Sequence, residues 1–158
     1  MTTRTTVTPA VELKQGSTFT AAHLGKLSEI ARYETTVPQF KRAIRGKVFL
    51  KGLLGLTGME VSVTSLPAGA ALKFLHRHRA HEELYLFTGG RGQMQVDGET
   101  FDVQEGSVVR IAPGGARTLR ATADAELRYL CIQAREGTMP DAEAADDGQP
   151  LATPVVWP

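Results

Sequence analysis

Hydrophobic and polar residues alternate along much of the chain between Gly46 and Ala134. In the run MEVSV, at residues 59–63, the methionine and the two valines fall on one face, while the glutamate and serine fall on the other. This alternation is typical of a half-buried antiparallel strand. Similar runs recur, separated by turns that carry glycine or proline. Short strands at even spacing predict an all-β sandwich or small barrel.

Two local signals refine this prediction. The Asp-Gly pair within VDGE, at residues 96–99, favours a two-residue β-hairpin. Ahead of the β-rich region, residues 21–34 place Leu24, Leu27 and Ile30 at helical spacing, and Gly25 disfavours a long helix. We therefore expect only one or two helical turns there.

The pattern divides the chain into three parts. Residues 1–45 form an N-terminal extension that we expect to pack on the barrel, residues 46–135 form the barrel, and residues 136–158 form a C-terminal tail. The tail begins with an acidic stretch and ends in PVVWP. One hypothesis is that Trp157 docks back on the sheet.

Length and charge narrow the function classes. At 158 residues the chain is long enough for one domain with its own core. Eighteen Lys and Arg against seventeen Asp and Glu give a formal charge of +1, which indicates neither a nucleic-acid nor a membrane-surface partner. The single cysteine, Cys131, cannot form an internal disulfide, and no signal-peptide or membrane-spanning pattern is found. A cytoplasmic location is the expectation.

Ionisable residues gather in FLHRHRAHEELYLF, at residues 74–87. If ALKFLHRH is a strand, His76 and His78 share one face, together with Leu72 and Phe74. After a tight connection, the next strand aligns Glu83, Tyr85 and Phe87. Two imidazoles and a carboxylate converging from adjacent strands are suited to one divalent ion, Fe²⁺, Mn²⁺, Zn²⁺, Ni²⁺ or Co²⁺, with positions left open for water or substrate.

Several neighbouring residues have alternative interpretations. His81 is a possible third imidazole ligand but more simply belongs to the turn, and Glu82 is the alternative carboxylate to Glu83. A buried, inert thiol is favoured over a nucleophile at Cys131. In GQMQV, at residues 92–96, either Met94 or the two glutamines beside it face the interior, and the sequence leaves this choice open.

These motifs resemble those of the cupin superfamily, whose members are small double-stranded β-helix (jelly-roll) barrels that often carry one metal ion. The first family motif has a His-x-His pair, a later glutamate, and a glycine six residues beyond it. Here His76 and His78 form the pair, Glu83 follows, and Gly90 comes after six more residues. The resemblance covers residues 47–134 and is closest to small single-domain cupins of an uncharacterised subgroup.

The second motif departs from the family at one position. Gly106 and the run PGG at residues 113–115 match it, but Arg117 and Thr118 stand where a fourth ligand histidine is expected. A guanidinium cannot ligate a metal ion, whereas its fork can clamp a carboxylate or phosphate. We therefore expect Arg117 to orient a ligand, with Tyr85 and Phe87 shaping the pocket.

The resemblance implies a metal-binding cupin with a pocket for a small polar or anionic molecule, and an oxygenase or an isomerase is the enzyme class to consider. The alternative is a metal-free, non-catalytic binding or sensory module. The sequence does not decide whether the protein is an enzyme.

The outer face of the first-motif strand carries a further indication. Leu84 and Leu86 lie opposite Glu83 and Tyr85, so both faces of this strand are apolar. Either residues 37–54 or a second subunit must cover the outer face. A homodimer is the preferred prediction, because two-fold dimers are the commonest oligomers.

Overall fold

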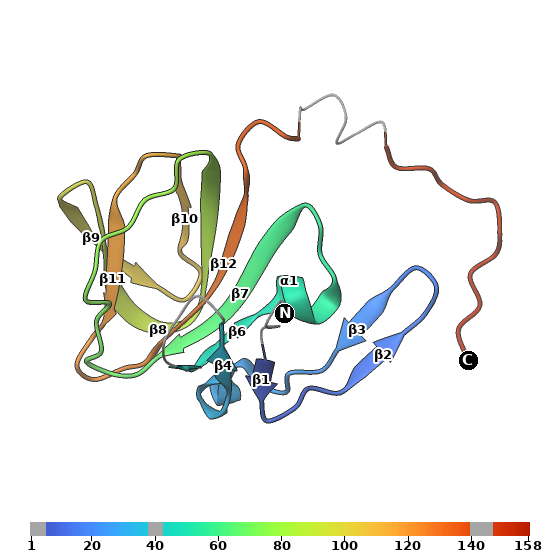
Figure 1. Cartoon of the computed structure of the whole chain (residues 1–158), viewed down its shortest axis with the longest axis horizontal. Coiled ribbons are helices and arrows are strands. Elements are labelled where there is room, and N and C mark those ends of the chain that lie inside the picture. The colour runs from blue at the N-terminus through green and yellow to red at the C-terminus, as the bar shows by residue number, and fades with distance from the viewer. Residues whose placement is uncertain (1–5, 38–42, 140–146) are drawn as a thin grey trace.

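The computed structural model describes residues 6–37, 43–139 and 147–158 (Figure 1). Its central sheet has the strand order β10-β8-β12-β7-β6, and β9 and β11 also pair with β8. The strands are β6 (Lys47–Phe49), β7 (Met59–Leu66), β8 (His81–Val96), β9 (Glu99–Gln104), β10 (Val108–Ile111), β11 (Arg117–Ala121) and β12 (Leu127–Arg135). All described pairings are antiparallel. The prediction of an all-β jelly-roll barrel is confirmed.

Strand β8 holds the barrel together because it belongs to both of its sheets. Its first half pairs with β10 and β12, and its second half pairs with β9 and β11. The change of partner occurs near Gly90, where the β8–β12 register shifts. Gly90 has φ of 78°, and a Cβ there would lie 1.6 Å from the Glu126 carbonyl oxygen. Only glycine fits so close an approach between the strands.

The predicted hairpin joins β8 to β9. Asp97 and Gly98 both have positive φ, 48° and 91°, as a two-residue turn of this kind requires. The structure also decides the choice in GQMQV: Met94 is fully buried, whereas Gln93 and Gln95 are partly exposed. Met94 therefore belongs to the barrel interior.

The interior of the barrel is a packed apolar core. Tyr85, Phe87 and Tyr129 lie at its centre, with ring centroids 5.7 to 6.4 Å apart. The other buried members of this cluster are Met94, Val103, Ile111, Leu119, Ala121, Leu127 and Cys131. Burial of this set provides the main driving force for closing the barrel.

The N-terminal extension contributes a second core on the outer side of the same sheet. Its elements are β1 (Thr6–Thr8), β2 (Leu13–Gln15), β3 (Thr20–Ala22), the 3-10 helix η1 (Leu27–Arg32), β4 (Glu34–Thr36) and β5 (Ile44–Arg45). Ile30 of η1 and Tyr33 pack against Val48 of β6 and Val63 of β7. The short helical segment predicted for residues 21–34 is thus present as η1.

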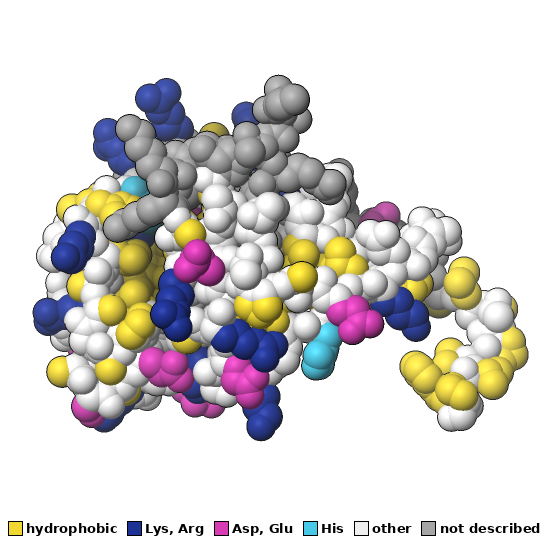
Figure 2. Space-filling view, turned by 60° about the horizontal axis from the view of Figure 1, so that its bottom comes forward, with side chains coloured by type: hydrophobic (Ala, Val, Ile, Leu, Met, Phe, Trp, Pro, Cys, Tyr) yellow, Lys and Arg dark blue, Asp and Glu magenta, His cyan; other side chains and the backbone are white. Residues whose placement is uncertain are grey.

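The structure corrects three expectations. Residues 71–78 do not form a strand but an extended segment that meets β11 at two isolated bridges, Ala71 with Arg120 and His76 with Arg117. Phe74, expected inside with His76, is 57% exposed. Trp157 does not dock on the sheet: it is 85% exposed, and the tail stands away from the body (Figure 2).

The cover over the outer face of β8 is incomplete. Leu84 remains 38% exposed. Residues 37–54 are one of the two covers considered from the sequence, the other being a second subunit, and within this segment residues 38–42 lie outside the described part of the chain. The segment also contains the short helix α1 (Leu50–Leu54), which the sequence pattern did not predict. In the described ranges, no helix is long and apolar enough to cross a membrane.

Candidate metal centre

Backbone contacts with the second motif position the two histidines. The amide of His76 donates to the Arg117 carbonyl at 3.3 Å, and the amide of Arg117 donates back to the His76 carbonyl at 3.0 Å. The His78 carbonyl accepts a hydrogen bond from the amide of Gly114 at 2.8 Å. The segment that carries both imidazoles is therefore fixed against the β10–β11 connection and the start of β11.

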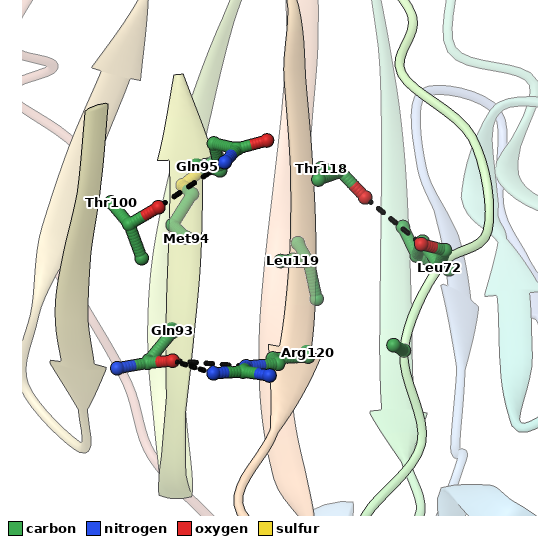
Figure 3. A pocket seen from close by; sticks show the side chains of 9 residues that line it. Leu72, Gln93, Met94, Gln95, Thr100, Thr118, Leu119 and Arg120 are labelled. Carbon is green, nitrogen blue, oxygen red and sulfur yellow. Dashed lines mark hydrogen bonds between the residues drawn. The ribbon is translucent and has the colours of Figure 1, made fainter. Parts of the chain in front are cut away.

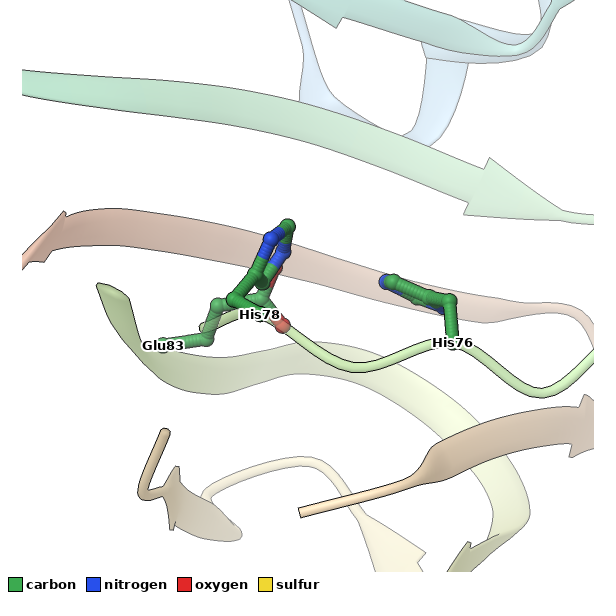
Figure 4. Close-up of side chains that lie close together, drawn as sticks. All are labelled: His76, His78 and Glu83. Carbon is green, nitrogen blue, oxygen red and sulfur yellow. The ribbon is translucent and has the colours of Figure 1, made fainter. Parts of the chain in front are cut away.

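Glu83 reaches the histidines from the beginning of β8. Its side chain is buried, and its Oε1 lies 2.9 Å from Nε2 of His78. One candidate ligand atom from each of His76, His78 and Glu83 can be chosen so that all three lie within 4.8 Å of one another. In Figure 4 the His78 ring and Glu83 lie together, and His76 lies further along the same loop. The structure thus brings together the three residues expected from the sequence.

The two alternative ligands lie outside this group. The side chain of Glu82 lies on the opposite face of the strand from that of Glu83, and it accepts a hydrogen bond from Nε of Arg110 at 2.5 Å. His81 is exposed, and its ring centroid is 6.3 Å from that of His78. Strand alternation therefore places Glu83, rather than Glu82, on the inner face.

Arg117 is the residue that most changes the character of the site. Its side chain is buried and forms an ion pair with Glu83, with Nη2 2.5 Å and Nε 3.0 Å from Oε2. Its Nη1 donates to the carbonyls of His76 and Gly115, each at 3.2 Å. These donors therefore face protein groups, and they fix Glu83 and the histidine loop together.

Glu83 receives hydrogen bonds on both oxygens. Tyr85 donates its hydroxyl to Oε2 at 2.7 Å, beside Arg117, while Oε1 faces His78. Burial opposes ionisation of Glu83, but the hydrogen bonds from Tyr85 and Arg117 and the charge of Arg117 outweigh it. The pKa of the Glu83 carboxyl consequently lies below its ordinary value. At neutral pH Glu83 is a carboxylate.

His76 is kept neutral by its surroundings. Burial lowers the pKa of its imidazole, and the positive charge of Arg117 lowers it further. Its Nδ1 is buried without a hydrogen-bond partner among the described residues. A neutral imidazole with a free ring nitrogen is the form that binds a metal ion.

These features fit a divalent ion. Ligand atoms about 2.0–2.2 Å from a Zn²⁺ ion lie roughly 3 to 4 Å from one another, so a separation of up to 4.8 Å requires only a small contraction. Arg117 contacts Oε2 of Glu83 and leaves Oε1 without a guanidinium contact. Nδ1 of His76 has no hydrogen-bond partner among the described residues. Because a metal ion binds imidazole in its neutral form, two imidazole ligands and a carboxylate paired with a guanidinium would give the ion a ligand set with no net charge.

The other predicted site residues lie in the barrel wall. Phe87 is 1% exposed and packs in the core. Tyr85 is also buried, and its hydroxyl is bonded to Glu83. Burial raises the pKa of the Cys131 thiol to about 12. Cys131 is therefore a protonated, buried side chain at neutral pH, as the sequence favoured.

The sequence analysis did not single out Lys47. In β6, Lys47 pairs with Thr64 of β7, and its neighbour Val48 belongs to the outer core. Lys47 therefore faces the barrel interior, where its charge contributes to lowering the pKa of His76. The available signal was the alternation in KVF, which puts the lysine and the phenylalanine on the face opposite a buried valine.

Two cavities lie away from the histidines. One, of about 280 Å³, lies against β8, β9 and β11, where Gln93 accepts hydrogen bonds from Arg120 (Figure 3). The other, of about 450 Å³, lies between the N-terminal extension and α1. Neither cavity is lined by the three candidate ligands or by Arg117.

Comparison with known proteins gives consistent matches. A family model described as "Cupin domain" matches residues 62–133. The crystal structure of a cupin protein from Bacteroides fragilis is 36% identical, with a TM-score of 0.63, and the match covers 73% of this chain and 100% of that one. A cupin-like protein from Thermotoga maritima is 25% identical, with a TM-score of 0.50 over 60% of this chain and 71% of that one.

A curated relative matches a shorter region. An uncharacterised protein from Methanocaldococcus jannaschii is 33% identical over 66 residues, which amount to 42% of this chain and 52% of that protein. The chain thus matches about half the length of this relative.

Proposed function

This chain belongs to the cupin superfamily, and from that premise we propose that it binds one divalent metal ion through His76, His78 and Glu83. The observation that carries the proposal is the convergence of three ligand atoms within 4.8 Å. The unpartnered Nδ1 of His76 supports it, because buried polar atoms without a hydrogen bond are rare. The function is to hold the ion beside a small polar or anionic molecule in the barrel.

The remaining residues of the site would hold the ligands in place. Arg117 and Tyr85 orient the Glu83 carboxylate through Oε2 and leave Oε1 toward the ion. Such outer contacts fix the orientation of metal ligands. A bound ion would act as a Lewis acid toward a ligand oxygen. An oxygenase or an isomerase remains the enzyme class that we propose for such a site.

One observation favours a second candidate, a metal-free binding module. Glu83 already interacts with Tyr85, Arg117 and His78, and a buried carboxylate with three partners is stable without an ion. In this alternative the histidines are structural, and a small molecule binds without metal.

Metal analysis of untagged protein distinguishes the two candidates. After growth with added Fe²⁺, Mn²⁺ and Zn²⁺, we expect near-stoichiometric metal in the wild type and little in His76→Ala or His78→Ala. His81→Ala is the matched control, because His81 is exposed and outside the ligand group. Wild-type protein without metal, or His76→Ala with unchanged metal content, would contradict the metal site and favour the metal-free module.

A further inference from the structure

The larger of the two cavities, about 450 Å³, opens onto the outer core between the N-terminal extension and α1. Val7, Val11 and Leu53 line it and also form part of the partly buried edge of that core. The other apolar side chains that line it are those of Ala10, Leu13, Phe49 and Leu54. We call this cavity the apolar groove. An apolar segment bound in it would extend the outer core.

One wall of the apolar groove, the β2–β3 hairpin, belongs to no larger sheet. Strand β2 pairs with β3, and these two strands form a separate two-stranded sheet in the described part of the chain. Every residue of β2 is exposed, including Leu13, which lines the groove, and Phe19 beside β3 is exposed as well. Because a two-stranded hairpin is marginally stable in water by itself, a partner that packs in the groove would also stabilise the hairpin.

The C-terminal tail carries apolar surface that fits such a groove. Leu151, Val155, Val156 and Trp157 are 74% to 85% exposed, and Figure 2 shows them on a part of the chain that stands away from the body. Contiguous exposed apolar side chains mark interaction sites. Prolines 154 and 158 bracket the last three of these residues and restrict the backbone, so that less conformational entropy is lost when the segment binds.

The tail of the same chain does not occupy the apolar groove. In Figure 1 the C-terminus lies at the end of the molecule that carries β2 and β3, and the tail stands clear of both strands. The tail is thus placed to meet a neighbouring copy. Each copy has one tail and one groove, so a reciprocal exchange about a two-fold axis fills both grooves and closes the assembly as a dimer.

We propose that residues 151–158 of one copy bind in the apolar groove of a second copy, and that the two copies exchange their tails. Trp157 is the anchor of the exchange. An aromatic side chain buries about 150–250 Å² on binding, and tryptophan is enriched among the residues that dominate the energy of interfaces. The exchange is independent of the proposed metal site, because none of its residues is a candidate ligand.

Trp157 is the only tryptophan of the chain, so tryptophan fluorescence reports on the tail alone. As the concentration of wild-type protein rises, sedimentation should show that monomer converts to dimer. Over the same range the emission of Trp157 should shift to shorter wavelength, and its quenching by acrylamide should fall several-fold.

Three results of these measurements would overturn the exchange. The first is a dimer in which Trp157 is quenched as readily as in the monomer. The second is a protein that stays monomeric, whether its Trp157 is exposed or protected, since protection in a monomer would mean that the tail binds its own chain. The third is a monomer whose native mass shows a bound apolar small molecule that protein concentration does not displace.

Two matched substitutions locate the interface. Leu13→Glu places a charge in the wall of the apolar groove and should weaken the dimer by about tenfold or more. Val108→Glu places the same charge on β10, next to Leu86 on the outer face of the central sheet, and should leave the dimer unchanged. The reverse order would place the interface on that sheet face and overturn the exchange.

A peptide covers the case in which Leu13→Glu does not fold. Full-length Trp157→Ser has no tryptophan, so the emission of a synthetic peptide of residues 150–158 reports its binding to this protein. We expect that emission to shift to shorter wavelength in a saturable manner. A control peptide with Val155→Ser and Val156→Ser keeps the tryptophan and should bind at least several-fold more weakly. Emission that the protein does not change, or equal binding of the two peptides, would overturn the inference.

Discussion

Arg117 of β11 and Glu83 of β8 form a buried ion pair, in which Nη2 lies 2.5 Å from Oε2. The two residues are 34 positions apart, one in each family motif. Because Arg117 replaces the expected fourth histidine, a fixed positive charge compensates the only carboxylate among the three proposed ligands. The pair should therefore link the stability of the barrel to the affinity of the proposed metal site.

Replacing Arg117 with Met should have opposite effects on stability and on metal binding. The metal-free protein should lose about 3–5 kcal/mol of unfolding free energy, because a buried carboxylate is left without its cation. A divalent ion should bind more tightly and restore much of that loss, since removing the guanidinium removes a repulsive charge. Urea denaturation with and without metal, together with calorimetry, measures both effects.

Arg110→Met is the matched control for this substitution. Arg110 pairs with Glu82 and Glu136 at the surface, so its loss should have little effect on stability and leave metal affinity unchanged. A stable metal-free Arg117→Met protein with unaltered metal affinity would show that the buried pair does not control the site.

The two adjacent glutamates should respond differently to amide substitution. Glu83→Gln removes the carboxylate that faces His78 and leaves Arg117 buried without an anion, so metal content and stability should both fall, the latter by about 3–5 kcal/mol. Glu82→Gln breaks only a surface contact with Arg110. Metal analysis and denaturation of the two variants test this order, and the reverse order would mean that Glu82 is the inner residue.

Acid should destabilise the metal-free protein in two steps. The unfolded chain takes up a proton at His76 near pH 6.5 and at Glu83 near pH 4.5, whereas the folded chain resists both because both pKa values are lowered. The unfolded state therefore binds more protons, and stability falls as pH drops through these values.

Urea midpoints measured in EDTA between pH 7.5 and pH 4 test this dependence. His76→Gln should flatten the decline around pH 6.5 and retain the decline at lower pH. A wild-type midpoint that stays level or rises as the pH falls from 7.5 to 5.5 would contradict the predicted role of His76.

The native thiol of Cys131 should react slowly with iodoacetamide. With a pKa of about 12, its thiolate fraction at pH 8 is roughly a thousandfold below that of an ordinary cysteine, for which the pKa is about 8.5. Mass spectrometry should show slow alkylation of native protein and rapid alkylation in urea. Equal rates in both states would identify an accessible, reactive thiol.

Local alternation was sufficient to predict part of this site. In HEELYLF, at residues 81–87, the period of two places Glu83, Tyr85 and Phe87 inside and Leu84 outside, as the structure shows. The Asp97-Gly98 turn was likewise predictable, because its backbone conformation depends on the two residues themselves.

The remaining features depend on contacts between distant segments. The run at residues 71–78 has a strand-like pattern, but only two isolated bridges join it to β11, so Phe74 stays outside. Alternation could not show that Arg117 would use its donors on Glu83 and two carbonyls. Lys47 faces the barrel interior only because β6 pairs with β7, and the sequence does not specify this pairing.

The sheet with a core on each face limits how this protein can be shortened. A fragment starting at Lys47 would retain every proposed ligand but would expose Val48 and Val63, which now pack against Ile30 and Tyr33. Such a fragment would expose an apolar surface on β6 and β7, and it would tend to self-associate through this surface. Engineering of the proposed metal site should therefore begin from the whole 158-residue chain, with the N-terminal extension kept in place against the sheet.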